Sequence, residues 1–555
     1  MIVTGKACRP TLERLLSGNP RWLAAEVDPE GRNGARPSIL ALHAPGGESA
    51  AFDLGQVDPE MGAAFGSLPC PLAAFDAKPL VRGLLNHGFS LPPRIACVKI
   101  IEILIQGSVG GGSSELGPLA QRYGMGPIPD AREGIDALLR VPELVSSVLE
   151  RQISALRDKQ LVWVSRIESA VLPAIAEMEH VGVPLDAPRW RALLEDGRLE
   201  REALREELAG LLGGAKDLFG EHSALDSEPG LREALRRAGH AVPNMRRDTL
   251  SALPAPLGPK LGRFRELAKL VQAYGATFLD KVDSAGRIHA TFEQIGASTG
   301  RMACHSPNLQ SVVKDSPYRE CFRATEGRAL VTADYAGCEL RIIAELSGDP
   351  VFRRTFAQGG DLHASVASTV FEVPVSKTQN PELRQRAKAI NFGLAYGMGA
   401  GGLARATGLS IEESRRFLER YFRAFPRIRE FLEHTAREAV QRGYAQTMTG
   451  RRMVLEHDGS KDARARAERV AKNMPIQGTN ADVVKIALAR LRRALAGEDA
   501  HVVNTVHDEI VVEVPAQRGA ELAEVVKREM EAAGAEVLKQ VALEVDASLG
   551  PAWAK

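Results

Sequence analysis

Two apolar, strand-like runs that each carry an aspartate constrain this chain most. The first is "ALVTADY", with Asp334 near its end, and the second is "NTVHDEIVVEV", with Asp508 at a turn between alternating segments. A long, mostly helical block lies between them, which predicts helices inserted between strands. A lone aspartate at a strand end is usually a cap or turn residue. If the two strands are neighbours, however, the two carboxylates can together hold divalent cations such as Mg²⁺.

Length and composition set the broad class. At 555 residues the chain is too long for one core, so several domains are expected. The formal net charge of +1 excludes a global basic field, and any nucleic-acid surface must come from local clustering. The six cysteines form no CxxC pair and no zinc spacing, which predicts reduced thiols. The start lacks a signal peptide, and the most apolar segment, "RIACVKIIEILIQG", is too short and too charged to cross a bilayer. A cytoplasmic protein without membrane contact is expected.

A third feature is a stripe of cations and aromatic rings in "LRQRAKAINFGLAYGMG". Arg384, Lys388, Phe392 and Tyr396 recur at every fourth position, so a helix places them on one face. Core packing would explain the rings but not the cations, and a solvated face would explain the reverse. The mixture suits a ligand with a polyphosphate end and a flat base, because Arg and Lys bind phosphate and aromatic rings stack on bases.

Four motifs in order give the chain a recognisable family character. They are "STGRMACHSPNLQSV", "TADYAGCELRIIAELSGDP", "RQRAKAINFGLAYG" and "VHDEIVVEV". With "ERVAKNMPIQGTNADVVKIAL" and the ending "LGPAW", the chain resembles the family A DNA polymerases of the bacterial DNA polymerase I type, from about Ile167 onward. The resemblance implies a multidomain α/β and α+β protein. It would have a right-hand polymerase fold of palm, fingers and thumb, preceded by an RNase H-like exonuclease-type domain, as in a large fragment without the 5′ nuclease domain.

The implied domains follow one another along the chain. They are a degenerate 3′–5′ exonuclease-like domain (1–160), the thumb (161–290), the first part of the palm (291–336), the fingers (337–450) and the second part of the palm (451–555).

The resemblance also implies an activity and its catalytic residues. A primer 3′-hydroxyl would attack the α-phosphate of a template-paired dNTP and release pyrophosphate. Asp334, Asp508 and the backbone carbonyl of Tyr335 would hold two Mg²⁺ ions, for which Mn²⁺ could substitute. Glu509 would assist without being a principal ligand, and Lys388 would act on the triphosphate.

Nucleotide and DNA contacts are implied in the same way. The nucleotide-binding residues would be Arg384, Lys388, His363, Phe392, Tyr396 and Glu339. The first three would grip the triphosphate, the two rings would stack near the base pair, and the glutamate would exclude a ribose 2′-hydroxyl. The DNA-binding residues would be Arg301, Asn308, Gln310, Arg341, Arg469, Asn473, Gln477 and His507. The expected partners are primer–template DNA and dNTPs, bound by a monomer at the nucleoid of a bacterial or phage-infected cell.

The first palm motif departs from the family pattern D-Y-S-Q-I-E-L-R. Ala336, Gly337 and Cys338 replace its three middle residues, and the lost polar side chain at Gly337 removes a possible hydrogen bond near the nascent pair. The expected catalytic carboxylates are unchanged.

The expected exonuclease motifs are also altered. Glu26 and Asp28 stand in reversed order, and the next two expected aspartates fall near Leu80 and Cys97, with Asp76 close by. Neither Leu nor Cys can replace a carboxylate on Mg²⁺, so the favoured interpretation is a scaffold that has lost proofreading. The alternative is a working site rebuilt from Glu26, Asp28 and Asp76.

Three other functions remain open from the sequence. One is a proofreading-competent DNA polymerase, another is a single-subunit RNA polymerase-like enzyme, and the third is a non-catalytic DNA-binding replication scaffold. Glu339 with Phe392 favours deoxynucleotides, and the joint presence of Asp334, Asp508 and Arg384 argues against a scaffold.

Overall fold

The computed structural model describes residues 2–27, 39–108, 115–126, 134–212, 223–314, 316–395, 398–456 and 459–553. The chain divides into two compact units. The larger comprises residues 1–181, 291–305 and 327–550, and the smaller comprises 182–290, 306–326 and 551–555. The larger unit includes α7 (Val162–Val181), which the sequence places in the thumb, because α7 packs on α21 (Thr479–Ala494).

In the described ranges, no helix combines the length and apolar character needed to cross a membrane.

The N-terminal part of the larger unit is a six-stranded sheet with helices on both faces. Its strands, in spatial order, are β1 (Ile2–Gly5), β4 (Ser49–Val57), β3 (Ile39–His43), β2 (Leu23–Val27), β5 (Leu72–Ala74) and β6 (Ile95–Cys97). Strands β2, β5 and β6 run parallel to one another. Side chains alternate across β2: Leu23, Ala25 and Val27 enter one core, whereas Ala24 enters the other, as the period of a strand requires.

Six helices accompany this sheet. They are α1 (Cys8–Leu16), α2 (Pro59–Ala64), α3 (Ala77–Asn86), α4 (Val98–Gln106), α5 (Leu116–Arg122) and α6 (Ile135–Asp158). Helices α1, α2 and α3 contribute to the first core, and α4, α5 and α6 contribute to the second.

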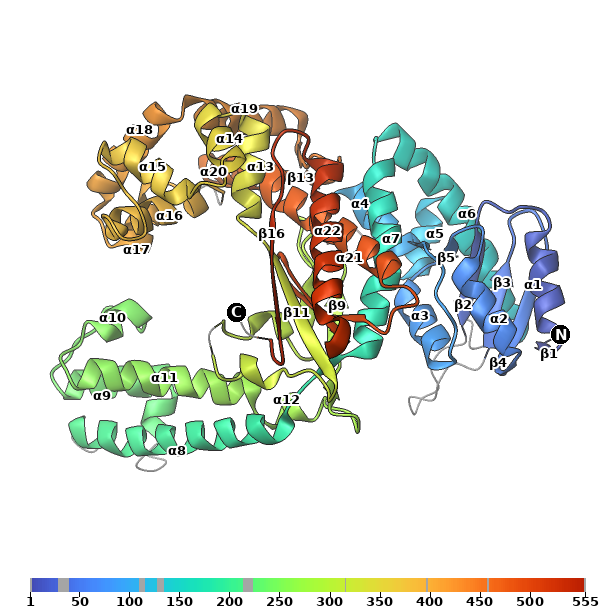
Figure 1. Cartoon of the computed structure of the whole chain (residues 1–555), viewed down its shortest axis with the longest axis horizontal. Coiled ribbons are helices and arrows are strands. Elements are labelled where there is room, and N and C mark those ends of the chain that lie inside the picture. Colours follow the sequence, from blue (N-terminus) through green and yellow to red (C-terminus); the bar gives the residue numbers. More distant parts are fainter. Residues whose placement is uncertain are drawn as a thin grey trace. The chain divides into compact units, whose positions relative to one another are not determined.

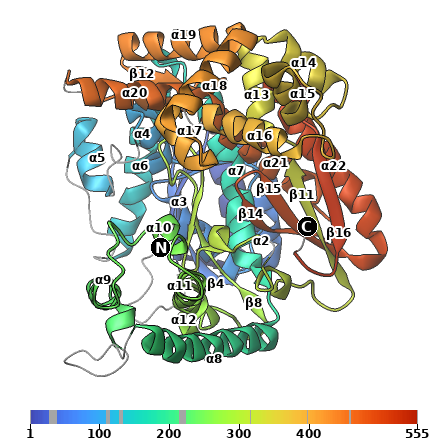
Figure 2. The same cartoon turned by 90° about the vertical axis from the view of Figure 1, so that its left-hand side faces the viewer.

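A second sheet, antiparallel and four-stranded, carries the two aspartates. Its order is β14 (His501–Val506), β15 (Glu509–Pro515), β11 (Arg328–Tyr335) and β16 (Val545–Gly550), as Figure 2 shows. Helix α22 (Gly519–Val537) packs against β11 and β16, and the Tyr335 hydroxyl donates to the carbonyl of Met530 in that helix (2.7 Å). The two central strands are buried along almost their whole length, which holds their ends rigidly.

A helical block is inserted between β11 and β14. Its helices are α13 (Cys338–Ser347), α14 (Pro350–Ala357), α15 (Leu362–Phe371), α16 (Pro381–Ala395), α17 (Ala400–Thr407), α18 (Ile411–Ala424) and α19 (Pro426–Arg442). Asp349, Asp361 and Ser410 cap α14, α15 and α18 by accepting backbone N–H bonds, which explains where these helices begin. The arrangement matches the sequence expectation of helices between strands.

Shorter elements complete the larger unit. They are β9 (Thr291–Glu293), β10 (Ala303–His305), β12 (Tyr444–Gln446), β13 (Arg452–Val454) and α20 (Lys461–Asn473), which continues through a π-helical turn (Met474–Gly478) into α21. All six cysteines of the chain are buried and free, as the sequence predicts.

The smaller unit is mainly helical. It contains α8 (Ala187–Leu211), α9 (Glu228–Arg237), α10 (Arg247–Ser251), α11 (Leu257–Tyr274), α12 (Ala276–Leu279) and the short pair β7 (Val183–Pro184) and β8 (Arg287–Ile288). The long helices α8 and α11 lie side by side (Figure 1). Trp190 of α8 packs against the rings of Tyr274, Phe278, Tyr318 and Phe322, which ties residues 306–326 to these helices.

Candidate active site

The structure brings Asp334 and Asp508 together at one end of the second sheet. Asp334 is the penultimate residue of β11 and pairs in register with Glu509, the first residue of β15. Asp508 lies in the turn just before Glu509, and its carbonyl accepts the backbone N–H of Tyr335 (3.4 Å). His507 begins this turn with φ 57°, so the chain reverses sharply and places the aspartate beside the end of β11.

The electrostatics of this pair indicate a cation-binding site. Burial raises the pKa of Asp508 to about 7, and the nearby charges of Asp334 and Glu339 raise it further, whereas Arg301 opposes them. Two crowded carboxylates cannot both be charged at low cost unless a cation neutralises them. Among the described residues no set of three His, Cys, Asp or Glu side chains could hold a metal. A two-carboxylate site suits Mg²⁺, which keeps several waters and takes further oxygens from substrate phosphates.

Glu339 and Arg301 lie beside the two aspartates. Glu339 stands in the first turn of α13 and pairs with Arg301 (2.5 Å). Burial raises the pKa of Glu339, and the pairing with Arg301 counteracts this. Gly337, which precedes the helix, has φ 68°, a conformation that favours glycine. The departure from the family pattern at Gly337 therefore fits the backbone that starts α13.

His507 also lies near this group. Burial lowers the pKa of His507, and the charge of Arg301 lowers it further, which favours a neutral imidazole next to the two aspartates. Glu509 is nearly inaccessible at 5% exposure, so its carboxylate is held within the palm sheet.

A second group of sequence-predicted residues gathers on α15 and α16. The Arg384 Nε donates to Asp361 (2.7 Å), and Asp361 in turn caps α15. Burial lowers the pKa of His363 to about 4; Asp361 opposes the shift, whereas the charges of Arg384 and Lys388 add to it. These three basic side chains are therefore close enough to feel one another, and the histidine is neutral.

Asn391, which sequence reasoning missed, fixes the orientation of His363. The Tyr421 hydroxyl donates to the Asn391 amide oxygen (3.1 Å), so the amide nitrogen faces His363 Nδ1 (3.1 Å). Nδ1 therefore accepts this bond, and the ring proton lies on Nε2. Asn391 follows Arg384 by seven residues and Lys388 by three, so helical spacing was a signal that could have identified it.

Two predicted members of the stripe cannot be placed by their side chains. Phe392 lies in α16, but its side chain is outside the described part of the structure, as is the whole of Tyr396.

The predicted DNA contacts on α20 and the π-helical turn lie on one continuous helical segment. Arg469 is exposed on α20, Asn473 ends that helix, and Gln477 lies in the π turn. The Asn473 side-chain oxygen is buried without a hydrogen-bond partner in the structure. Because π turns are rare and often occur at functional sites, this segment is a good position for polar ligand contacts.

A buried ionic network, also missed by sequence reasoning, lies behind the loop that carries Arg301. Arg451 contacts Glu168 and Asp482, and the Lys485 Nζ donates to Glu168 (2.6 Å). Gly300 has φ 88°, and a Cβ there would lie 2.5 Å from the Arg451 Nε. The network therefore supports the backbone immediately before Arg301.

The structure assigns Arg341 a different place from the predicted DNA contact. It is 5% exposed, and its guanidinium donates to the carbonyls of Ala336 (2.8 Å) and Ala542 (2.7 Å) and to Glu544 (2.6 Å). It also lies over the ring of Phe356, 4.5 Å from the centroid. All of its donors point into the fold, so Arg341 anchors the start of α13 to the segment before β16.

Asn308 and Gln310 belong to the smaller unit. The Asn308 side-chain oxygen accepts the N–H of Gln310 (3.0 Å) and caps a 3₁₀ turn, Leu309–Ser311. Asn308 is exposed and Gln310 is half-buried, so both can reach a ligand on the surface of this unit.

The exonuclease-like position in the N-terminal sheet lacks a set of metal ligands among the residues that the structure describes. Burial raises the pKa of Glu26 at the end of β2 to about 7, and nearby Asp76 contributes to the rise. Asp76 caps α3 and pairs with the Lys99 Nζ (2.8 Å), so a lysine supplies the positive charge there. The Cys97 thiol, whose pKa burial raises to about 11, donates to the Phe75 carbonyl (3.3 Å). Asp28 lies outside the described residues.

Comparisons with known proteins agree with this geometry. A sequence model of DNA polymerase family A matches residues 199–555. The chain is 35% identical over 452 residues to the thermostable DNA polymerase I of Thermus filiformis, covering 78% of this chain and 52% of that protein. It is 30% identical over 446 residues to DNA polymerase I of Lactococcus lactis, covering 77% of this chain and 50% of that protein. The chain thus spans about half the length of the curated relatives it matches.

A solved structure matches over the whole chain. It is the POL domain of Pol1 from M. smegmatis in complex with DNA primer-template and dNTP. The TM-score is 0.86 with 29% sequence identity, and the alignment covers 100% of this chain and 99% of that one. The fold expected from the sequence motifs is confirmed.

Proposed function

Because this chain belongs to DNA polymerase family A, we propose that it is a template-directed DNA polymerase that extends a primer 3′-hydroxyl with dNTPs. The observation that carries the proposal is the meeting of Asp334 and Asp508, from strands far apart in sequence, at one end of a buried sheet. The partners proposed are primer–template DNA and dNTPs, the ligands with which the similar POL domain of Pol1 is in complex.

Asp334, Asp508 and the Tyr335 carbonyl would hold two Mg²⁺ ions, or Mn²⁺ in their place. The donor set fits, because the carboxylate of Asp508 is buried beside a second carboxylate and gains from a neutralising cation. When bound, such ions lower the pKa of the attacking hydroxyl and neutralise charge on the leaving oxygens.

The basic residues on α15 and α16 would hold the triphosphate. Arg384 and Lys388 supply positive charge, and the Nε2–H of His363 supplies a neutral donor. As the hydroxyl oxygen bonds to the α-phosphorus, the bond to the β-phosphate bridging oxygen breaks and pyrophosphate leaves. The leaving charge then lies against these three side chains, whose positions are fixed by Asp361 and Asn391.

Glu339 and its neighbours would select the sugar and hold the primer. The buried carboxylate of Glu339 would crowd a ribose 2′-hydroxyl, and Arg301 would reach the primer–template minor groove from its pairing with Glu339. Glu509 would support the metal site. Phe392 and Tyr396 are proposed as stacking residues on the family resemblance, and Asn308, Gln310, Arg469, Asn473, Gln477 and His507 as DNA contacts.

We further propose that the N-terminal domain has lost proofreading. The support is the Asp76–Lys99 ion pair and the thiol of Cys97, which leave Glu26 and Asp76 as the described carboxylates at that position.

Primer extension on a defined template tests the polymerase proposal. Asp508→Ala should reduce the rate by about 10³-fold or more, since the cation site loses half of its carboxylates. Asp499→Ala is the matched control, because Asp499 is exposed and pairs with Arg328 and His501, and Arg328 begins β11 at the opposite end from Asp334. Its rate should be unchanged. Equal rates for the two variants would refute the proposed site.

The same assay separates the remaining alternatives. Extension with dNTPs but not with rNTPs is expected, because of the buried Glu339. Extension with rNTPs alone would indicate an RNA polymerase, and DNA binding without any extension would indicate a scaffold.

A further inference from the structure

A pocket of about 360 Å³ lies in the N-terminal domain, away from the residues discussed so far. Trp22, Pro71 and Arg94, which line it, directly precede the first residues of β2, β5 and β6. Because these three strands are parallel, their starts share one edge of the sheet, whereas Glu26 lies toward the opposite edge, at the end of β2. The pocket is therefore distinct from the exonuclease-like position.

Four arginines surround the pocket. Arg21, Arg94, Arg157 and Arg166 are all exposed, and no acidic residue lines the pocket with them. None of the four forms an ion pair in the part of the chain that the structure describes; Arg21 instead lies over the Trp22 ring, 5.2 Å from its centroid. The rim thus carries positive charge that the described residues leave uncompensated.

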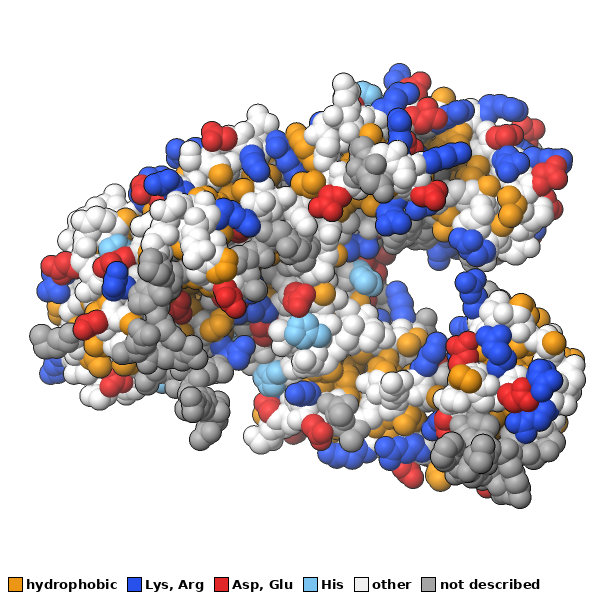
Figure 3. Space-filling view, turned by 180° about the vertical axis from the view of Figure 1, so that it is seen from behind, with side chains coloured by type: hydrophobic (Ala, Val, Ile, Leu, Met, Phe, Trp, Pro, Cys, Tyr) orange, Lys and Arg blue, Asp and Glu red, His pale blue; other side chains and the backbone are white. Residues whose placement is uncertain are grey.

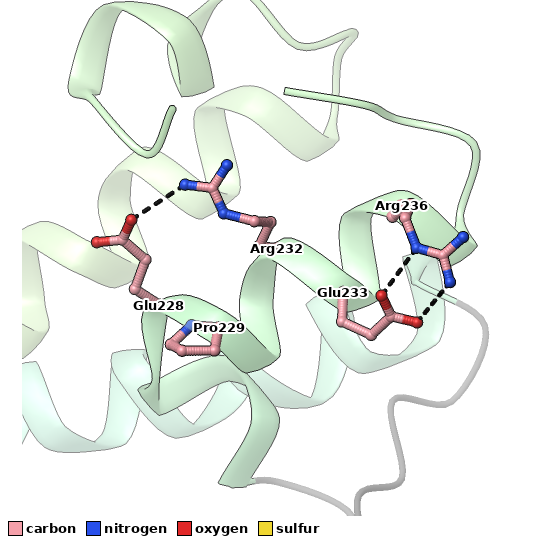
Figure 4. A pocket seen from close by; sticks show the side chains of 5 residues that line it. All are labelled: Glu228, Pro229, Arg232, Glu233 and Arg236. Atoms are coloured by element: carbon pink, nitrogen blue, oxygen red, sulfur yellow. Dashed lines mark hydrogen bonds and ion pairs between the residues drawn. The ribbon is translucent and has the colours of Figure 1, made fainter. Parts of the chain in front are cut away.

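This is not how arginines are usually placed in this protein. On α9, for example, Arg232 pairs with Glu228 (3.2 Å) and Arg236 with Glu233 (2.8 Å), as Figure 4 shows. On the face drawn in Figure 3, Lys and Arg side chains are likewise interspersed with Asp and Glu. The pocket's rim is an exception on a chain with a net charge of only +1, which points to an anionic partner.

The floor of the pocket is aliphatic. Ile101, Leu149, Ile153, Leu156 and Val162 line it, contributed by α4, α6 and the start of α7. The indole of Trp22 is 5% exposed and its Nε1 donates to the Ser146 hydroxyl (3.1 Å), so it offers no stacking face to a base. Single-stranded nucleic acid is bound chiefly by stacking on open rings, whereas this floor suits an apolar side chain.

We propose that this pocket docks a short acidic peptide segment of a partner protein, with one apolar side chain on the aliphatic floor and carboxylates on the arginine rim. Arginine suits this task because its planar guanidinium forms two parallel hydrogen bonds with a carboxylate. The partner would be recruited to the N-terminal domain without occupying the polymerase site. The inference rests on the pocket alone and does not depend on polymerase activity.

Fluorescence anisotropy with the full chain tests this docking site. The probe is a fluorescein-labelled peptide of four acidic residues followed by Leu-Phe. Saturable binding is expected, weakened by salt because the contacts are charged. Arg94→Ser with Arg157→Ser should weaken it by about tenfold for each charge removed, whereas Arg232→Ser, an exposed arginine with its own glutamate, should leave it unchanged.

Two further arms keep the result decisive. Replacing Leu-Phe by Ala-Ala in the probe should weaken binding to the wild-type chain, and the exposed-arginine variants should keep wild-type primer extension. An absence of saturable binding, or equal binding by the double variant, would overturn the proposal. Loss of single-stranded oligonucleotide binding in that variant, with peptide binding intact, would overturn it in favour of nucleic acid.

Discussion

Individual side chains in the proposed nucleotide site work through their neighbours. His363 would be protonated in part at neutral pH if it were exposed, but burial and the flanking Arg384 and Lys388 hold its pKa near 4. Asn391 then fixes which ring nitrogen carries the proton. A neutral donor beside two fixed cations can bind a phosphate oxygen without adding a third repelling charge to the unliganded site.

This lowered pKa predicts a pH dependence of stability. The unfolded chain binds a proton at His363 below about pH 6.5. The folded chain does so only near pH 4, so the histidine costs stability as the pH falls between these values. His363→Gln should therefore show a smaller drop in melting temperature between pH 7 and pH 5 than the wild type. His434→Gln is the control, since His434 is exposed and pairs with Glu438 on its own helix. An equal drop in wild type and His363→Gln would contradict the prediction.

Among the structural elements, the loop before Arg301 depends on the buried network behind it. Gly300→Ala would place a Cβ against the Arg451 guanidinium and strain a positive φ. Arg451 is held by Glu168 and Asp482 and cannot move freely, so the loop itself should shift. We expect primer–template affinity to fall about tenfold, which corresponds to about 1.4 kcal/mol, with the KM for dNTP little changed.

Gly327→Ala is the matched control for this loop. Gly327 also has a positive φ, 76°, but a Cβ there meets no atom within 4 Å. It therefore carries the same kind of backbone strain without the clash. Titration of labelled primer–template against both variants gives the comparison, and equal weakening in the two would show that the contact with Arg451 has no role in DNA binding.

The same elements show what the sequence could and could not predict. Asp334 and Asp508 stand in short motifs at strand ends, and the helical stripe of Arg384 and Lys388 has a regular spacing, so local patterns were sufficient for them. The network could not be predicted, because Arg451 and Lys485 lie 283 and 317 residues from Glu168. No spacing rule connects such positions, and an isolated Arg reads as a surface or DNA-binding residue. The same limit explains Arg341, whose carbonyl partners Ala336 and Ala542 carry no side-chain signal.

In the molecule as a whole, one fold retains two sites in different states. The C-terminal sheet keeps crowded carboxylates that need a cation, whereas the N-terminal sheet keeps an Asp76–Lys99 pair that already has one. A lysine at hydrogen-bond distance competes with a metal for the same carboxylate oxygen, and the leucine at position 80 is fully buried in the core. The domain can therefore remain as a folded support while its nuclease chemistry is lost.

This contrast predicts the behaviour of a primer without nucleotides. Labelled primer–template incubated with the full chain and Mg²⁺, but without dNTPs, should keep its length on denaturing gels, since the N-terminal site cannot hold two metals. Lys99→Ala should not restore shortening, because removing the amine supplies no third carboxylate. The same preparation must extend the primer once dNTPs are added, which shows that the protein is active and bound. Steady loss of nucleotides from the 3′ end, abolished by Glu26→Gln but not by Asp508→Ala, would instead establish a rebuilt exonuclease site around Glu26 and Asp76.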